Sequence, residues 1–465
     1  MEIVNPNVKN FIKSLRDIGY TFEVAVADVI DNSITAKSKN IKIHSTNESN
    51  LIFSIFDDGI GMNEKELIEA MRLSSKDPDE KRDNKDLGKF GLGLKTASFS
   101  QCRQLTVITK KNNIVSTRKW DLDFISQKNE WYLLTPKKEE IRDYYFYEEL
   151  LKKDSGTIII WEKIDRYSRE EFEDILFSMR EHLRLVFHVF IEKNDLKIFL
   201  NNGELEAFNP FNSSNLATQE NPTEVIKCYG NDIKIKPYIL PHHSKLTQLE
   251  YDKYETKEGY LKGQGFYLYR AERLLIYGTW WGLHKITDSH KLVRIKIDIN
   301  NNQDEYWGID VKKSQAKPAS NIKLELKRII NNITPKSSRV YTKRGKKIED
   351  KNTIKFWNLL PVKGSFRFSL NKDHPLLERL FENLDKERKS FFDLYLKGLE
   401  AYLPLESIQA QLQENPLKIK QETALSKEEI DDIIYKLKKS NLSKDVIEKF
   451  LKTEIFKNRR ELIDE

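Results

Sequence analysis

The sequence predicts an α+β protein with two α+β domains followed by a helical C-terminal region. Up to residue 188, segments patterned as strands alternate with segments of helical periodicity. From 189 to 335 short strand-like segments dominate, and from about residue 371 apolar residues recur at helical spacing to the end of the chain. Residues 336–370 include a basic stretch of low hydrophobicity, which we interpret as a linker.

The first region begins with a predicted helix over residues 22–36, in which apolar side chains recur at helical spacing and form one face. A second predicted helix follows Asn63, which suits the N-cap position. Residues 74–87 are polar, charged and contain one proline, so we expect a long mobile loop there. The other elements expected up to residue 188 are strands at 40–45, 51–56, 105–110, 114–120 and 156–164, and helices at 94–101 and 170–187.

The second region is expected to be a separate α+β domain. Two alternating segments flank the Asn-Gly dipeptide at residues 202–203, which is typical of a tight hairpin turn. Strand-like patterns recur at 263–278 and 291–300. Near the C-terminus, Ser426 and Ser443 each precede an acidic first turn and are expected to cap a helix.

Composition narrows the class of protein. A chain of 465 residues exceeds what one hydrophobic core normally supports, and 39% hydrophobic with 32% charged residues suits a soluble globular protein. No apolar run is long enough to cross a bilayer, and no secretory signal is visible. The two cysteines, Cys102 and Cys228, fit no metal spacing, so we expect a cytoplasmic protein. The net charge of +7 permits contact with nucleic acid without requiring it, because 72 acidic residues nearly offset 79 basic ones.

Three oxygen-bearing side chains fall on one face of the first predicted helix. Asp28, Asp31 and Asn32 occupy positions i, i+3 and i+4, opposite the apolar face. Such a set could hold Mg²⁺ and a water, because this ion prefers hard oxygen ligands and keeps several waters. The alternative is the solvated polar face of an amphipathic helix, which for this pattern alone is the commoner arrangement.

An acidic turn, DDGIGM at residues 57–62, follows the second strand. Asp57 at the strand end could accept a hydrogen bond from an exocyclic amine such as that of adenine. Gly59 and Gly61 would let the backbone approach a ligand closely. The alternative is an ordinary acidic turn after a strand.

A glycine loop precedes a further predicted helix. Gly88, Gly91 and Gly93 follow the order G-x-x-G-x-G after a run of charges, and Lys95 lies just inside the helix. Glycines at this place expose backbone N–H groups at the positive end of the helix dipole, which is a ready site for phosphates. A Gly-Thr pair at residues 156–157 begins a later strand and has little meaning alone.

The order and intervals of these four features resemble the ATPases of gyrase, Hsp90, histidine kinases and MutL, known as the GHKL group. The similarity is greatest to the MORC-like and MutL-like bacterial branch, often described as DNA mismatch repair-like, and it is carried by DVIDNSITAKSKNIKI, FDDGIGM and LGKFGLGLKTASFSQCRQLTV. The resemblance implies a Bergerat α/β-sandwich ATPase domain over residues 1–188 with a lid at about 72–92. A Rossmann site is excluded, because the glycine spacing differs and no βαβ unit with a ribose-binding acid follows the loop.

The second region, residues 189–335, resembles the S5-like transducer domain of gyrase B, MutL and MORC proteins. GFYLYRAERLLI is similar to a surface hairpin of that domain, and WGIDVKKSQAKPA at residues 307–319 is similar to its loop carrying a lysine that reaches the γ-phosphate. Lys313 is the expected lysine, with Lys312 as the other candidate, and a simple basic loop end is an equal alternative. The helical C-terminal region, residues 371–465, is only loosely similar to the same bacterial group.

The resemblance implies binding of ATP with Mg²⁺. Asn32 would hold Mg²⁺ through its side-chain oxygen, Asp57 would select adenine, and Thr157 would complete the adenine side. Lys313 or Lys312 would contact the γ-phosphate and report whether ATP is intact. The other residues expected to contact ATP line the base pocket or wrap the phosphates, and they are Gly59, Gly61, Met62, Gly88, Lys89, Phe90, Gly91, Leu92, Gly93 and Lys95.

Asp28 occupies the position of the general base, which polarises the water that attacks the γ-phosphate. Most of the group has glutamate there, and aspartate is one methylene shorter. Since a misplacement of about 1 Å can cost on the order of 10²-fold in rate, either hydrolysis is slow or the helix lies closer to the phosphates. Thr35 stands where the group often has aspartate, and we expect weaker support of the helix there.

These features favour an ATP-driven conformational clamp. ATP would order the lid, two subunits would associate into a homodimer through their N-terminal regions, the transducer domains would move, and hydrolysis would reset the cycle. The substrate would be DNA or a DNA-bound protein complex. Basic side chains are candidates for phosphate contacts, with a solvated linker as an equal alternative: Lys336, Arg339, Lys343, Arg344, Lys346 and Lys347.

No nuclease motif, topoisomerase tyrosine region or zinc site is visible, so we expect partner proteins of nuclease or helicase type encoded in the same operon. A bacterial restriction or anti-phage system follows only by analogy. Two alternatives stay open. One is a nucleotide-gated scaffold that binds ATP with little hydrolysis, motivated by the aspartate at residue 28. The other is an Hsp90-like chaperone acting on proteins.

Overall fold

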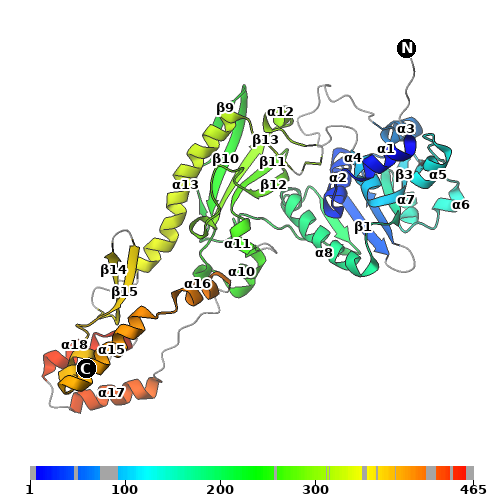
Figure 1. Ribbon diagram of the computed structural model, residues 1–465. Coiled ribbons are helices and arrows are strands. Elements are labelled where there is room, and N and C mark those ends of the chain that lie inside the picture. Colours follow the sequence, from blue (N-terminus) through cyan, green and yellow to red (C-terminus); the bar gives the residue numbers. More distant parts are fainter. Residues whose placement is uncertain are drawn as a thin grey trace. The chain divides into compact units, whose positions relative to one another are not determined.

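The computed structural model describes residues 7–46, 51–73, 93–255, 259–310, 312–313, 315–347, 353–362, 365–382, 384–414, 426–439 and 443–456 (Figure 1). The chain divides into two compact units, one formed by Met1–Pro241 and Asp252–Ser337 and the other by His242–Tyr251 and Ser338–Glu465. The first unit holds two α+β domains, which confirms the predicted fold class. None of the helices within the described ranges combines the length and apolar character needed to span a membrane.

The first domain is built on a seven-stranded sheet with the order β4-β3-β5-β2-β1-β6-β7. Its strands are β1 (Asn40–Thr46), β2 (Ile52–Asp57), β3 (Cys102–Lys111), β4 (Ile114–Asp121), β5 (Gly156–Ile164), β6 (Lys197–Leu200) and β7 (Gly203–Glu204). Neighbouring strands are antiparallel except β1 and β6, which are parallel. The end of β2 therefore lies beside the start of β5, and Asp57 is directly opposite Thr157.

Helices cover both faces of this sheet (Figure 1). One layer consists of α1 (Val8–Arg16), α2 (Phe22–Thr35), α4 (Gly93–Gln101) and α8 (Arg169–Val186), and α6 (Lys138–Ile141) and α7 (Tyr147–Lys152) lie on the other side. Successive side chains of a strand point to opposite faces, so Phe53 packs edge-on against Phe22 of α2 while Phe56 stacks near Phe146. The shorter helices of the domain are α3 (Glu64–Met71), α5 (Leu122–Lys128) and α9 (His188–Glu192).

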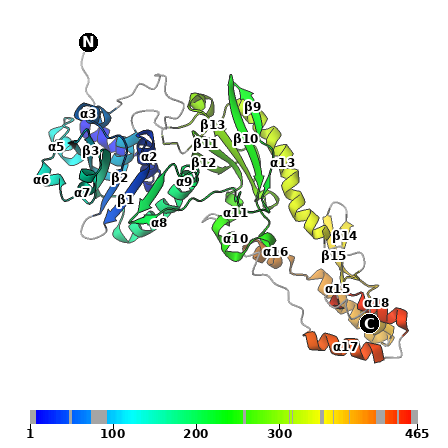
Figure 2. The same cartoon turned by 180° about the vertical axis from the view of Figure 1, so that it is seen from behind.

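The second domain contains a six-stranded sheet with the order β12-β11-β13-β10-β8, in which β9 also pairs with β10. Its strands are β8 (Gln219–Glu220), β9 (Glu224–Cys228), β10 (Asn231–Ile239), β11 (Gly265–Arg270), β12 (Arg273–Thr279) and β13 (Val293–Ile299), and its helices include α11 (Gly259–Lys262) and α12 (Asp304–Trp307). The helices α10 (Gln248–Glu255) and α13 (Ser320–Lys347) each contain residues of both compact units. Figure 2 shows α13 beside β9, where Arg328 pairs with Glu224 at 2.6 Å. The predicted strands at 263–278 and 291–300 are confirmed.

The predicted boundary between the two domains at residue 188 is wrong. The Asn-Gly hairpin is present, with Asn201 and Asn202 at φ of 44° and 69° as a tight hairpin turn requires. However, β6 pairs with β1, so this hairpin completes the sheet of the first domain. The change of sequence character near residue 190 therefore marks the last strands of the first domain, because strand patterns do not reveal which sheet a strand joins.

The predicted basic linker over residues 336–370 is also wrong in its described parts. Residues 336–347 continue helix α13, because lysine and arginine are good helix formers and a basic composition does not oppose a helix. Residues 357–370 form a hairpin of β14 (Trp357–Val362) and β15 (Ser365–Leu370). The C-terminal region is helical as expected, with α14 (Pro375–Glu382), α15 (Lys386–Ala401), α16 (Leu405–Glu414), α17 (Lys427–Lys439) and α18 (Lys444–Leu451).

Candidate functional site

Helix α2 places two aspartates inside the protein. Its apolar residues pack in the main core, and the opposite face carries Asp28 and Asp31, which are only 3% and 1% exposed. The alternative interpretation, a solvated polar face, is therefore wrong for these two carboxylates, although Asn32 is exposed. A buried carboxylate requires a charged or hydrogen-bonding partner, because desolvation without one is costly.

The partners of both carboxylates include cations from the second domain. Lys313 Nζ lies 3.2 Å from Asp28 Oδ1 and 2.5 Å from Asp31 Oδ2. Arg273 Nε, at the start of β12, lies 3.0 Å from Asp31 Oδ1. Two negative and two positive charges thus form one buried cluster that joins helix α2 to the second domain.

The pKa values of the two carboxylates are shifted in opposite directions. Burial raises the pKa of Asp28, and the nearby cation of Lys313 only partly opposes this effect. Burial acts in the same direction on Asp31, but Arg273 and Lys313 outweigh it and lower the pKa of Asp31. Asp31 is therefore a firmly ionised anchor, whereas Asp28 has the raised proton affinity that suits a general base.

Sequence reasoning singled out neither Arg273 nor the loop between α1 and α2. Tyr20 Oη donates to Asp28 Oδ2 at 2.9 Å, and the carbonyl oxygen of Gly19 accepts from Lys312 Nζ at 3.3 Å. The structure thus separates the two candidate lysines: Lys313 lies at the aspartates and Lys312 at the loop. One signal for Arg273 was present in the sequence, namely a single arginine directly before the apolar run LLI.

The end of β2 forms a compact polar site around Asp57. Its Oδ1 accepts from the backbone N–H of Gly59 and its Oδ2 from Ser33 Oγ of helix α2, both at 2.9 Å. Opposite it, Thr157 Oγ1 lies 3.2 Å from Thr109 Oγ1, which also accepts from the backbone N–H of Met62 at 2.9 Å. The structure therefore brings Asp57, Met62 and Thr157 together, as expected for the adenine side, and adds Thr109 of β3, which sequence reasoning did not single out.

Two glycines permit this arrangement. Gly61 has φ of +61°, and a β-carbon on it would collide with the carbonyl oxygen of Lys110. A β-carbon on Gly156 would lie 2.6 Å from the carbonyl oxygen of Asp57. Any side chain at either position would push apart the strand ends that shape the site.

Burial raises the pKa of Asp57 to about 6, against the opposing effect of its two hydrogen bonds. At neutral pH most of this carboxylate is ionised, but its pKa lies close enough to neutral pH that a modest fall in pH protonates it. Each ionised oxygen accepts more than one hydrogen bond, so Asp57 can still accept from a ligand amine.

The phosphate end of the expected site is described in part. Gly88, Lys89, Phe90, Gly91 and Leu92, together with the lid from residue 74, lie outside the described residues. Gly93 begins helix α4, and a β-carbon built on it would lie 3.9 Å from Asp28 Oδ2. The positive end of this helix dipole is therefore next to the expected general base.

Lys95 was expected to contact ATP, and Thr35 was expected to support helix α2 weakly. In the structure both side chains donate hydrogen bonds to backbone carbonyl oxygens. Lys95 is buried and its Nζ donates to the carbonyl oxygen of Ala70 at 2.8 Å, which links α4 to the end of α3. Thr35 Oγ1 donates to the carbonyl oxygen of Asp31 at 2.9 Å, within α2. Both side chains support the backbone around the site in this structure.

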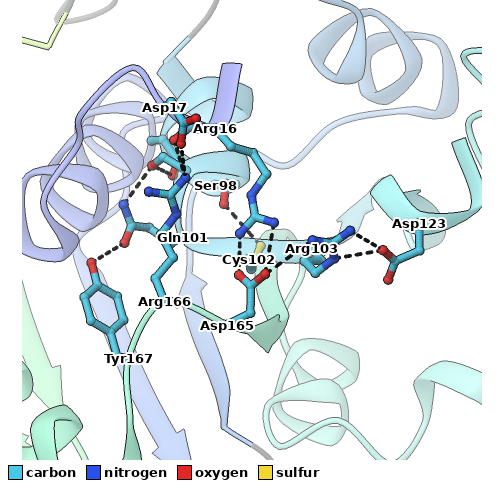
Figure 3. A network of polar contacts seen from close by, with 12 residues as sticks. Arg16, Asp17, Ser98, Gln101, Cys102, Arg103, Asp123, Asp165, Arg166 and Tyr167 are labelled. Atoms are coloured by element: carbon cyan, nitrogen blue, oxygen red, sulfur yellow. Dashed lines mark hydrogen bonds and ion pairs between the residues drawn. The ribbon is translucent and has the colours of Figure 1, made fainter. Parts of the chain in front are cut away.

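A separate network of polar contacts secures the end of α1 and the end of α4 (Figure 3). Arg16 of α1 forms a bidentate ion pair with Asp165, which also pairs with Arg103 at 3.4 Å. Gln101, the last residue of α4, accepts from the hydroxyl of Tyr167 at 2.8 Å. The end of α1 and the end of α4, which flank the α1–α2 loop, are therefore held by contacts with Asp165 and Tyr167.

Asn32 fits the role expected for a Mg²⁺ ligand. Its Nδ2 donates to the carbonyl oxygen of Asp28 at 3.1 Å, which leaves the hard amide oxygen as the atom suited to an ion. No group of three or more His, Cys, Asp and Glu side chains arranged for a metal is found among the described residues. A single protein oxygen completed by phosphates and waters is a usual arrangement for Mg²⁺.

Comparison with known proteins adds sequence similarity to this geometry. Residues 20–157 match the family of histidine kinase-, DNA gyrase B- and HSP90-like ATPases. The chain is 29% identical to the ATPase morc-1 of Caenorhabditis elegans over 108 residues, which are 23% of this chain and 12% of that protein. The crystal structure of the ATPase and transducer domains of DNA topoisomerase II from Balamuthia mandrillaris aligns with a TM-score of 0.39 and 13% identity, over 70% of this chain and 86% of that one.

Proposed function

We infer from the GHKL-type ATPase domain at residues 20–157 that this protein binds ATP with Mg²⁺, hydrolyses it, and uses the cycle to move its second domain. The observation that carries this proposal is the position of Lys313. This lysine belongs to the second domain, yet it lies between the two buried aspartates of helix α2. A cation that is shared with a γ-phosphate would make the placement of one domain depend on the nucleotide in the other.

The described residues of the site would each take a separate role in binding and hydrolysing ATP. Asp57 and Thr157 would orient adenine, and Asn32 would hold Mg²⁺, which offsets phosphate charge when bound. Asp28 would accept a proton from the attacking water. Lys313 would leave the aspartates for the γ-phosphate, and Asp31 would keep Arg273 as its partner when Lys313 moves.

We further propose that the cycle acts as an ATP-gated dimeric clamp on DNA or a DNA-bound protein complex, with partner proteins. The net charge of +7 and the basic end of helix α13 support a nucleic-acid partner. Among the six basic residues named above, Lys336 donates to Asn221 Oδ1 at 2.9 Å and stays exposed. A role in bacterial restriction or anti-phage defence stays a prediction from the resemblance.

The clamp predicts a nucleotide-dependent oligomeric state. With a non-hydrolysable ATP analogue and Mg²⁺, the full chain should elute from a size-exclusion column at twice the mass found with ADP. Adding DNA should stabilise the larger species, and rising salt should weaken this effect because phosphate contacts release counterions. An elution volume that is the same with ADP and with the analogue would remove the clamp from the proposal and leave nucleotide binding intact.

Nucleotide affinity should depend on the protonation of Asp57. Because the pKa of Asp57 is about 6, the protonated carboxyl group becomes the major form below pH 6. A protonated oxygen no longer accepts a hydrogen bond from the adenine amine. Between pH 7.5 and 5.0 we expect the affinity for ADP to fall about tenfold, measured by calorimetric titration. The matched control is Asp57→Asn, which should bind more weakly and lose this dependence, because only titration of the nucleotide itself remains. An equal dependence in both proteins would contradict the assignment of Asp57.

A further inference from the structure

The two carboxylate oxygens of Asp28 have different partners. Oδ2 accepts from Tyr20 Oη at 2.9 Å, and Oδ1 lies 3.2 Å from Lys313 Nζ. Tyr20 directly precedes Thr21, the N-cap residue of α2, whereas Lys313 comes from the second domain. One oxygen is therefore held from within the ATPase domain, and the other is held by a residue that the proposed cycle moves.

The phenol of Tyr20 is firmly placed. Tyr20 is buried, and its carbonyl oxygen accepts from Gln101 Nε2 at 3.2 Å. Gln101 is in turn held by Tyr167, as Figure 3 shows. The side chain of Thr96, on the first turns of α4, also hydrogen-bonds to the phenol.

The phenol also stays a hydrogen-bond donor. Burial, reinforced by the charge of Asp28, raises the pKa of Tyr20 far above its usual range. The phenol therefore keeps its proton at neutral pH, and a neutral phenol next to a carboxylate donates to it. The orientation of Asp28 thus has a lasting support that does not depend on Lys313.

We propose that Tyr20 is a positioning residue that holds Asp28 through Oδ2 and leaves Oδ1 as the oxygen that takes the proton from the attacking water. This inference rests on the proposed ATPase function. When Lys313 moves to the γ-phosphate, Oδ1 loses its cation and gains the freedom to accept that proton. Tyr20 keeps the carboxylate from rotating at the same moment.

This role explains how the shorter aspartate can serve where the family has glutamate. A carboxylate one methylene shorter has less reach, so its orientation must be set more precisely. The ring of Tyr20 is a rigid support, and it holds Asp28 beside Gly93 at the start of α4, where phosphates are expected. We therefore regard Tyr20 and Asp28 as one functional pair.

The test is ATP hydrolysis by the full chain carrying Tyr20→Phe, which removes only the hydroxyl. We expect kcat to fall by about 10- to 100-fold, in line with the cost of misplacing a catalytic group by up to about 1 Å. The affinity for a non-hydrolysable ATP analogue should stay within about twofold, because Tyr20 is assigned no contact with the nucleotide. The matched control is Tyr144→Phe, which removes another phenol–carboxylate bond, 2.8 Å to Glu162, and should leave kcat unchanged.

A double-mutant cycle separates positioning from a general structural effect. In an Asp28→Asn background, Tyr20→Phe should not lower the residual rate further, because its effect acts through the carboxylate. An equal loss in both backgrounds, or an unchanged kcat in Tyr20→Phe alone, would overturn the inference while the ATPase function stands. Wild-type protein that binds ATP and releases no phosphate would overturn the proposed function, and this inference with it.

Discussion

Replacing Asp28 with asparagine should lower kcat for ATP hydrolysis by about 10²- to 10⁴-fold, the usual contribution of a general base. Asparagine has nearly the same shape but cannot take a proton from water. The substitution also removes one negative charge from the cluster with Asp31, Lys313 and Arg273. Phosphate release under saturating ATP and Mg²⁺ measures the loss of kcat. Binding of an ATP analogue should persist, because Asp28 is assigned no contact with the adenine of the bound nucleotide.

A matched control for this prediction is Asp123→Asn. Asp123 also carries ion pairs, with Arg103 and Lys163, but it is much more exposed and belongs to the separate polar network drawn in Figure 3. Its replacement should leave kcat within about twofold, as surface pairs contribute little. If wild-type protein binds ATP without measurable turnover, the nucleotide-gated scaffold becomes the better description. If Asp28→Asn turns over at the wild-type rate, another group is the base.

Replacing Arg273 with methionine should cost about 3 kcal/mol of unfolding free energy, at the lower end of what breaking a buried ion pair costs. The side chains of Arg273 and Asp31 are 3% and 2% exposed, so water cannot replace the lost partner. Lys313 remains near Asp31 and limits the loss, which is why we expect the lower end of the range. Chemical denaturation of the full chain, followed by tryptophan fluorescence, measures the change.

The comparison that decides this prediction is Arg103→Met. Arg103 is 36% exposed and its partner Asp123 is 42% exposed, so its loss should cost about 1 kcal/mol or less. Combining Arg273→Met with Asp31→Asn should recover part of the stability, because Asp31→Asn removes the buried negative charge that has lost Arg273 as its partner. Equal costs for Arg273→Met and Arg103→Met would show that the buried cluster contributes no more than a surface pair.

Local patterns predicted the elements of the first domain well. Helix α2, with its N-terminus at Phe22, and strand β5 over Gly156–Ile164 lie where periodicity places them. Asn63 caps α3 with a complete capping box, as its position before an acidic turn indicates. These features depend on residues a few positions apart, which is the range over which sequence patterns carry information.

Non-local pairing explains one of the two errors in the predicted organisation of the chain. The hairpin of β6 and β7 was assigned to the second domain, yet β6 joins β1, more than 150 residues earlier in the chain. The supposed linker continues as helix beyond Pro335, a residue that usually ends or kinks a helix. The pairing of β6 with β1 leaves no short-range signal in the sequence, whereas the helix over residues 336–347 was missed because its basic composition is also typical of a linker.

The order and spacing of the motifs, together with their resemblance to the GHKL ATPases, identified Asp28, Asn32, Asp57 and the glycine turns as candidates for one nucleotide site. Only the tertiary structure showed that Asp28 and Asp31 are buried, that Tyr20 supports the first, and that Arg273 anchors the second. It also distinguished Lys313 from its neighbour Lys312, because these adjacent lysines differ only in which atoms they reach. The reason is distance along the chain: Arg273 and Lys313 lie more than 240 residues from their partners, so their roles depend on how two domains pack rather than on any local pattern.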